Sequence, residues 1–180
     1  LNVWTQSETK WMPIEHWKKC GLPIDYSALS GRKCFAGLDL SSTLDLTAFA
    51  LVFPPQAEED AYLVLSRFWM PQDNLQKRVH DDRVPYDVWV RGGFIEATPG
   101  NVIDYDYIFA QIARDMKQFK IEEIAFDRWG AARVANELQK MGLTMVEFGQ
   151  GYASMSPPMK ELERLVMAHR LAHGNNPVLN

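Results

Sequence analysis

The sequence predicts an α/β domain with a mixed sheet of about five strands, the first three antiparallel, flanked by helices. Three apolar segments with short polar connections come first, and later strand segments alternate with segments of helical spacing. The chain has 180 residues, which is the length of one domain that buries its own core without disulfides or a structural metal. The expected order is three hairpin-linked strands, then helix, strand, helix, strand and helix.

The first three strands are predicted from apolar runs that end at turn-forming residues. Residues 33–40 are mostly apolar and lead into Ser41-Ser42-Thr43, and residues 46–53 stop at Pro54-Pro55. Residues 62–69 form the third run. Connections of about five and eight residues favour antiparallel pairing between neighbours.

The segment from residue 71 to 100 is less regular. We predict short helical pieces over 74–82 and 85–91 and a short strand over 94–97, before a turn at Pro99-Gly100. Apolar residues then recur every three to four positions, which predicts a helix over 104–120.

The last third of the chain alternates strands and helices. Residues 121–126 read as a buried strand, and a helix over 131–141 is closed by Gly142. A strand over 144–148 and a helix over 157–170 follow.

Residues 1–30 differ in character from the rest, because tryptophans stand among charged residues and prolines. We predict an arm or linker with a short helix around residues 14–19, whose tryptophans dock on a protein surface. The α/β domain is then expected over residues 31–180.

Composition excludes several classes of protein. Nineteen Lys and Arg against 23 Asp and Glu give a net charge of −4, which excludes a polybasic binder that relies on a global positive field. Two cysteines, Cys20 and Cys34, are too few for a secreted disulfide scaffold and favour a reducing compartment. No apolar run reaches the roughly 18 residues of a membrane span, so we expect no membrane partner.

Two carboxylates lie at the ends of predicted strands, where open α/β sheets commonly bind their ligands. Asp39 lies near the end of the first strand, and Asp127 follows the strand over 121–126. If these strands are parallel neighbours, their ends lie about 5 Å apart. Mg²⁺ or Mn²⁺ takes oxygen ligands of this kind, and two such ions can clamp both oxygens of a phosphodiester displacement. The alternative is that both residues only cap turns or the following helix.

A functional role is less strongly indicated for the other polar residues. Asp45 either assists a metal site or hydrogen-bonds its own turn, and the turn is favoured. Glu147 ends a later strand and either reaches the site or lies exposed. Arg128 directly follows Asp127 and is a candidate for contact with a DNA phosphate. His169 and His173 have i, i+4 spacing, but no further Cys or His lies close enough in sequence to predict a zinc set.

Five segments, spread from end to end, resemble the nuclease domain of terminase large subunits of tailed bacteriophages. Gly37–Ala48 is similar to the first strand and hairpin of that family, and Phe126–Ala131 to its second acidic strand end. Further similarity lies in Leu1–Trp4, Ala97–Asp104 and Gly174–Asn180.

The resemblance implies a ribonuclease H-like fold and a two-metal endonuclease that cuts concatemeric double-stranded viral DNA during packaging. It assigns Asp39 and Asp127 as ligands of two Mg²⁺ or Mn²⁺ ions, with a third acidic ligand downstream of Asn180. Residues 1–30 would then connect to an N-terminal ATPase domain, since no phosphate-binding loop G-x-x-x-x-G-K-[ST] occurs here. The implied partners are viral DNA, the small terminase subunit, the portal or procapsid and the ATPase domain. The implied location is the host cytoplasm rather than the mature virion.

Two other functions remain open at this point. A ribonuclease H-like domain that lacks its third ligand can serve as a docking module for the portal, the small terminase or the ATPase domain. The run Gly37–Thr43 is also faintly similar to the phosphate loop of actin-like ATPases and sugar kinases, although Ser41 occupies the place of a required glycine.

Overall fold

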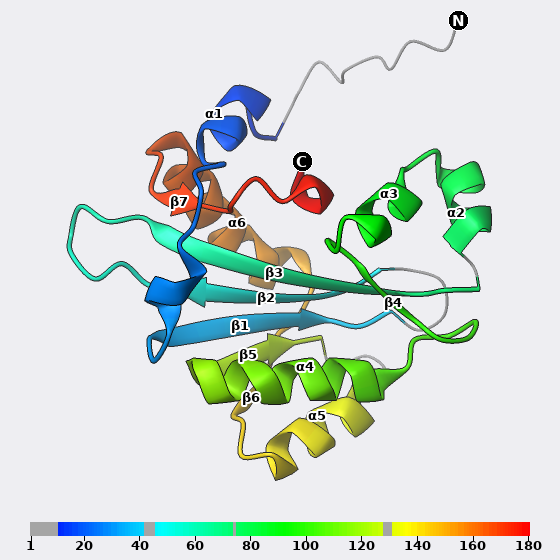
Figure 1. Cartoon of the computed structure of the whole chain (residues 1–180). Helices are drawn as coiled ribbons and strands as arrows, with labels where there is room; N and C mark the ends of the chain where they lie inside the picture. The colour runs from blue at the N-terminus through cyan, green and yellow to red at the C-terminus, as the bar shows by residue number, and fades with distance from the viewer. Residues whose placement is uncertain (1–10, 42–45, 74, 128–130) are drawn as a thin grey trace, which may run out of the picture.

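The computed structural model describes residues 11–41, 46–73, 75–127 and 131–180 (Figure 1). Its centre is a seven-stranded mixed sheet in the order β4-β3-β2-β1-β5-β6, with β7 also paired to β3. The strands are β1 Lys33–Asp39, β2 Thr47–Phe53, β3 Tyr62–Pro71, β4 Glu96–Thr98, β5 Lys120–Phe126, β6 Met145–Glu147 and β7 Leu171–Ala172. The strands predicted over 94–97 and 144–148 correspond to β4 and β6, and the strand that the sequence does not predict is β7, which has two residues.

Strand directions agree with the prediction. β1 and β2 are antiparallel, as are β2 and β3. β5 pairs with β1 in parallel, and β6 pairs with β5 in parallel. The parallel pair β1 and β5 is what brings the ends of two separate strands together.

The helices are α1 Ile14–Lys19, α2 Leu75–Asp82, α3 Tyr86–Arg91, α4 Tyr105–Gln118, α5 Ala132–Lys140 and α6 Tyr152–Met167, with single 3₁₀ turns at η1 Tyr26–Leu29 and η2 Pro177–Leu179. The short helix predicted around residues 14–19 is confirmed. α6 begins five residues before the predicted Pro157, so Pro157 and Pro158 lie inside the helix. Because each proline lacks an N–H, the carbonyls of Ala153 and Ser154 lose their helical donors.

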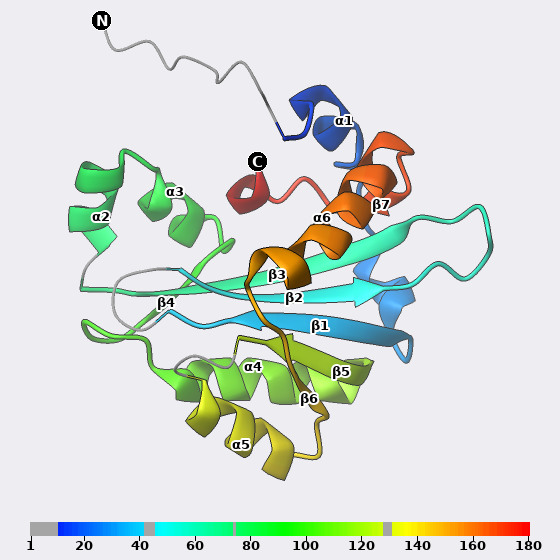
Figure 2. The same ribbon diagram turned by 180° about the vertical axis from the view of Figure 1, so that it is seen from behind.

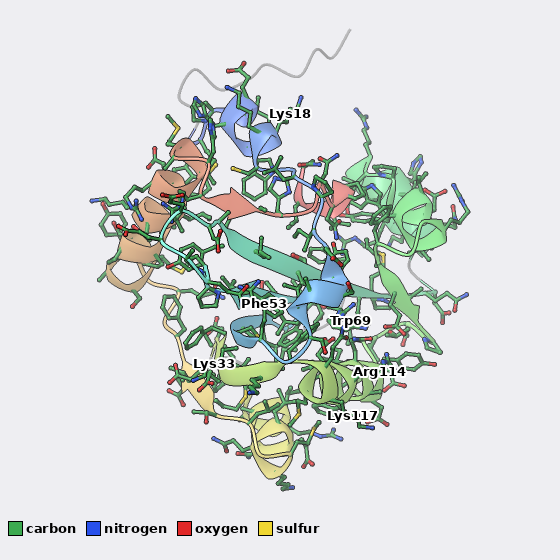
Figure 3. All side chains as sticks on the ribbon, turned by 60° about the vertical axis from the view of Figure 1, so that its left-hand side comes forward. Lys18, Lys33, Phe53, Trp69, Arg114 and Lys117 are labelled. Atoms are coloured by element: carbon green, nitrogen blue, oxygen red, sulfur yellow. The ribbon has the colours of Figure 1, made fainter. Side chains whose placement is uncertain are left out.

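Helices α4 and α5 cover one face of the sheet, and α6 crosses the other (Figures 1 and 2). The covered face carries alternate residues of each central strand, such as Leu38, Phe49 and Phe126, all less than a tenth exposed. They pack with Ile108 and Ile112 of α4 and with residues of α5 in the main core. In Figure 3, Phe53 and Trp69 lie inside the molecule while Lys18, Lys33 and Lys117 lie at its surface.

The other face has two smaller clusters. Cys20, Val166 and Leu171 join α1, the end of α6 and β7 beside the start of β3. Phe68, Met70 and Ile95 form the second cluster, against which residues of α2, α3 and η2 pack.

None of the helices in the described part of the chain is both long and apolar enough to span a membrane. Cys20 and Cys34 are both buried and free. Burial, reinforced by the charges of Asp115 and Glu122, raises the pKa of the Cys34 thiol to about 12, so this thiol stays neutral and belongs to the core.

An ion pair fixes α4 to β3. Arg67 donates two hydrogen bonds to the carboxylate of Asp115, of 2.6 and 3.1 Å, and the side-chain amide of Gln111 donates a third of 3.0 Å. The Asp115 side chain is 1% exposed and that of Arg67 is 29% exposed. The bidentate geometry of the Arg67–Asp115 pair compensates for the free-energy cost of removing the carboxylate from water.

Replacing Asp115 by Ala should lower the free energy of unfolding by about 3 kcal/mol, because Arg67 then loses both charge-assisted bonds in a partly buried site. Urea unfolding measures this change. Glu161→Ala is the control, since its pair with Arg164 is exposed and should leave stability nearly unchanged. Equal destabilisation by the two variants would contradict the role given to Asp115.

Candidate functional site

Asp39 and Asp127 lie at the ends of neighbouring parallel strands. Leu38 of β1 pairs with Phe126 of β5, so the next residue of each strand is one of the two aspartates. Strand spacing places their backbones about 5 Å apart. The sequence-based expectation that these strands are parallel neighbours is confirmed.

The two side chains also share a face of the sheet. Leu38 and Phe126 point into the core under α4 and α5, so the residues that follow them point to the opposite face. Asp39 is exposed and Asp127 is partly buried. The carboxylates therefore face the side that α6 crosses (Figure 2).

A β-bulge in β5 keeps the core-facing residues of β5 aligned with those of β1. Cys34 pairs with Ile121, yet Ala36 pairs with Ile124, so β5 uses three residues where β1 uses two. Such a bulge shifts the alternation of side chains by one residue. The spacing of the apolar residues Ile121, Ile124 and Phe126 in the sequence is the signal that would have predicted it.

The carboxylates border a cleft with a volume of about 350 Å³. Its floor is made of small residues from three adjacent strands, and its wall comes from the segment before α6 and from α6 itself. The lining residues are Gly37, Leu38, Asp39, Ala48, Ala50, Ala125, Phe126, Asp127, Phe148, Gln150 and Met155. Ala48 is the cross-strand partner of Asp39, so the β2 side of the cleft is flat beside that carboxylate.

Ser41 belongs to the hairpin rather than to a separate phosphate site. Its backbone N–H donates to Oγ1 of Thr47 at 3.0 Å, and the Tyr105 hydroxyl donates to its carbonyl at 3.4 Å. These bonds link the end of β1 to the start of β2 and to α4. Ser41 therefore shapes the hairpin between β1 and β2.

The structure separates Glu147 from the two aspartates. Glu147 pairs with Phe126, whose side chain points into the core, so the register directs Glu147 to the face opposite Asp127. Its neighbour Phe148 returns to the cleft side and donates its backbone N–H to the Phe126 carbonyl at 2.8 Å. Asp45 and Arg128 lie outside the described residues.

The two histidines with i, i+4 spacing do not share a helix face. α6 ends at Met167, and His169 has a φ of +53°, which takes the chain out of the helix. His173 follows β7 and is buried against Trp17, with ring centroids 4.2 Å apart. The spacing argument fails because the helix stops before the first histidine.

The profile of one protein family, described as terminase large subunit, endonuclease domain, matches residues 1–180. The chain is 42% identical over 166 residues to the terminase large subunit of Enterobacteria phage HK97, covering 91% of this chain and 32% of that protein. It is 28% identical over 186 residues to protein YmfN of Escherichia coli strain K12, covering 99% and 41%. The chain thus spans 32% and 41% of the length of these two relatives.

Two solved structures are similar. The crystal structure of the HK97 large terminase has a TM-score of 0.82 at 39% identity, covering 95% of this chain and 35% of that one. The large terminase nuclease of thermophilic phage G20c, crystallised with magnesium, has a TM-score of 0.55 at 12% identity, covering 91% and 76%. The latter bears on the fold alone, and it confirms the ribonuclease H-like class that the resemblance predicts.

If the cleft binds Mn²⁺, Asp39→Asn and Asp127→Asn should each weaken that binding by at least roughly tenfold, because each removes one of the two charged oxygen donors that border the cleft. Electron paramagnetic resonance of free Mn²⁺ measures the affinity. Glu147→Gln is the matched control, since it removes the same charge from the opposite face of the neighbouring strand. A loss of affinity in Glu147→Gln equal to that in the aspartate variants would place the ion elsewhere.

Proposed function

This chain belongs to the family of terminase large subunit endonuclease domains, and on that premise we propose that it cuts double-stranded DNA in a metal-dependent reaction. The substrate we propose is concatemeric viral DNA during genome packaging. The observation that carries the proposal is the pair of carboxylates, Asp39 and Asp127, at adjacent strand ends over a cleft with a small-residue floor.

Asp39 and Asp127 would hold two divalent ions, Mg²⁺ or Mn²⁺. The polar side chains among the described lining residues are two carboxylates and the amide of Gln150, which offer oxygen donors and no thiolate or imidazole. This donor set fits a hard cation. A magnesium-bound nuclease of the same fold supports the choice of metal. When bound, such ions supply Lewis acidity and a water that is nucleophilic at neutral pH.

The cleft itself accounts for access to the phosphodiester. Gly37, Ala48 and Ala50 carry little or no side chain, so a sugar–phosphate backbone can approach the sheet closely. Phe148 and Met155 form an apolar wall, and Gln150 provides an amide donor for a phosphate oxygen. These residues orient the strand, while the carboxylates fix the position of the reaction.

We also propose that residues beyond Asn180 complete the site in a longer form of the protein. Val178 and Leu179 of η2 pack on the cluster that includes Ala48, and Ala48 is the partner of Asp39. Asn180 itself is hydrogen-bonded to Trp17 of α1, so we propose that the residues after it run back along this face toward the cleft, where one of them supplies a third carboxylate. The ATPase domain, the small terminase subunit and the portal or procapsid are the partners that this function requires.

Cleavage of supercoiled plasmid with Mg²⁺ or Mn²⁺ tests the proposal, with this chain and with a form extended past Asn180. The extended form should cut, and Asp39→Asn and Asp127→Asn should each reduce the rate at least about 10²-fold, because a ligand of the reacting centre is lost.

Glu147→Gln in the extended form should cut at the parental rate. If the extended form is inert with either metal while properly folded, the endonuclease proposal fails, and a docking module for packaging partners becomes the better account. If cutting survives in both aspartate variants, the site lies elsewhere.

Gly37→Val should raise the KM for DNA several-fold without lowering the melting temperature. No described atom lies within 4 Å of a β-carbon built at Gly37, and valine is favoured in strands, so the fold accepts the side chain. The new side chain would fill the floor of the cleft beside Asp39. Steady-state cleavage and thermal melting measure the two effects, with Gly37→Ala as the graded control. An unchanged KM in Gly37→Val would show that DNA does not approach this floor.

A further inference from the structure

Two imidazoles from opposite ends of the chain meet at the surface, away from the carboxylate cleft. His16 lies on α1, and His169 lies two residues after the last residue of α6, Met167. Nδ1 of His16 and Nε2 of His169 are 3.2 Å apart, and the ring planes are inclined by 24°. α1 lies beside the C-terminal end of α6 in both views (Figures 1 and 2).

Contacts of Trp17 and Cys20, the residues that follow His16, position α1, so the imidazole pair is not what places this helix. The Trp17 ring stacks on buried His173, and its indole N–H donates to Oδ1 of Asn180 at 3.0 Å. The backbone N–H of His173 donates to the carbonyl of Cys20 at 3.0 Å. His16 is therefore held by packing in a place where it meets the other ring.

His169 occupies a backbone position that usually takes glycine. Its N–H donates to the Val166 carbonyl, and the N–H of Arg170 donates to the Leu165 carbonyl. This is the Schellman pattern, and the φ of +53° places His169 at its left-handed residue. A side chain is disfavoured there, yet this one presents an imidazole directly to His16.

The nitrogen separation fits a shared metal ion. Zn²⁺ binds imidazole nitrogen at about 2.0–2.1 Å, and tetrahedral geometry then sets two ligand nitrogens about 3.3 Å apart. Two neutral rings can bind by changing tautomer, with Nδ1 of His16 and Nε2 of His169 as ligands and no net release of protons. Imidazole suits Zn²⁺, Cu²⁺ or Ni²⁺ rather than Mg²⁺, so this pair differs in selectivity from the carboxylate cleft.

We propose that His16 and His169 form a binding site for a borderline transition-metal ion of the Zn²⁺ type, with water completing its coordination. The ion would join α1 to the end of α6 and so fix the N-terminal segment of the chain against the body of the domain. The proposal does not depend on the endonuclease function, because neither residue borders the cleft.

Thermal melting of the chain with increasing Zn²⁺ at pH 7.5, with excess Mg²⁺ present, tests the site. Zn²⁺ should raise the melting temperature by about 3 °C or more. His169→Gly should abolish this shift while keeping the fold, because glycine is the favoured residue at that backbone position. His16→Gln should abolish it as well. His80→Gln is the control, since His80 is exposed on α2 and should retain the shift.

Hydrogen exchange provides a local readout. Zn²⁺ should slow the exchange of the backbone amides of residues 16–20 in the parental chain and not in His169→Gly. No melting shift in the parental chain would overturn the proposal and leave a simple N–H···N hydrogen bond between the rings. An equal shift in His169→Gly would also overturn it, because the ion would then bind elsewhere.

Discussion

The burial of Ile124 and Phe126 under α4 and α5 is the constraint on which the site depends. In a strand, neighbouring side chains point to opposite faces, so fixing Phe126 in the core fixes Asp127 on the other face. The same reasoning applies to Leu38 and Asp39 on β1. The extra residue in β5, between Ile121 and Ile124, is absorbed as a bulge, because a slip of the whole strand would bury a glutamate. The core thus sets the register, and the register sets the two carboxylates side by side.

The two faces of the sheet consequently differ in how they are covered. One is sealed by α4 and α5, with the Arg67–Asp115 pair fixing α4 to β3. In the part of the chain that the structure describes, the other face carries α1 and the end of α6 over one end and α2, α3 and η2 over the other. Between them the described residues form the cleft, whose floor of Gly37, Ala48, Ala50 and Ala125 offers little side chain for a helix to pack on. The features that leave this face uncovered are the same features that let a polymer backbone approach it.

Most of this arrangement follows from local sequence pattern, and the exceptions have physical reasons. The sequence predicts both aspartates at strand ends, as the structure shows, because apolar runs mark β1 and β5 clearly. The sequence does not predict β7, because two residues paired to a distant strand leave no periodic signal. The sequence predicts a start of α6 at Pro157, because proline is common in a first helical turn, whereas the helix begins at Tyr152. No local sequence pattern predicts the proximity of His16 and His169, since the two residues are 153 positions apart.

At both candidate metal sites, the position of the polar residues in the fold determines which donor atoms face the site. Strand ends over an open sheet present carboxylates from neighbouring strands, and these oxygen donors select hard cations. The meeting of α1 with the end of α6 presents nitrogen donors from distant parts of the chain, and these select softer ions. The first site is formed by the strand pairing at the centre of the sheet, so it is as stable as the fold. The second exists only while α1 is docked, so any ion bound there would report on, and stabilise, the docking of that helix.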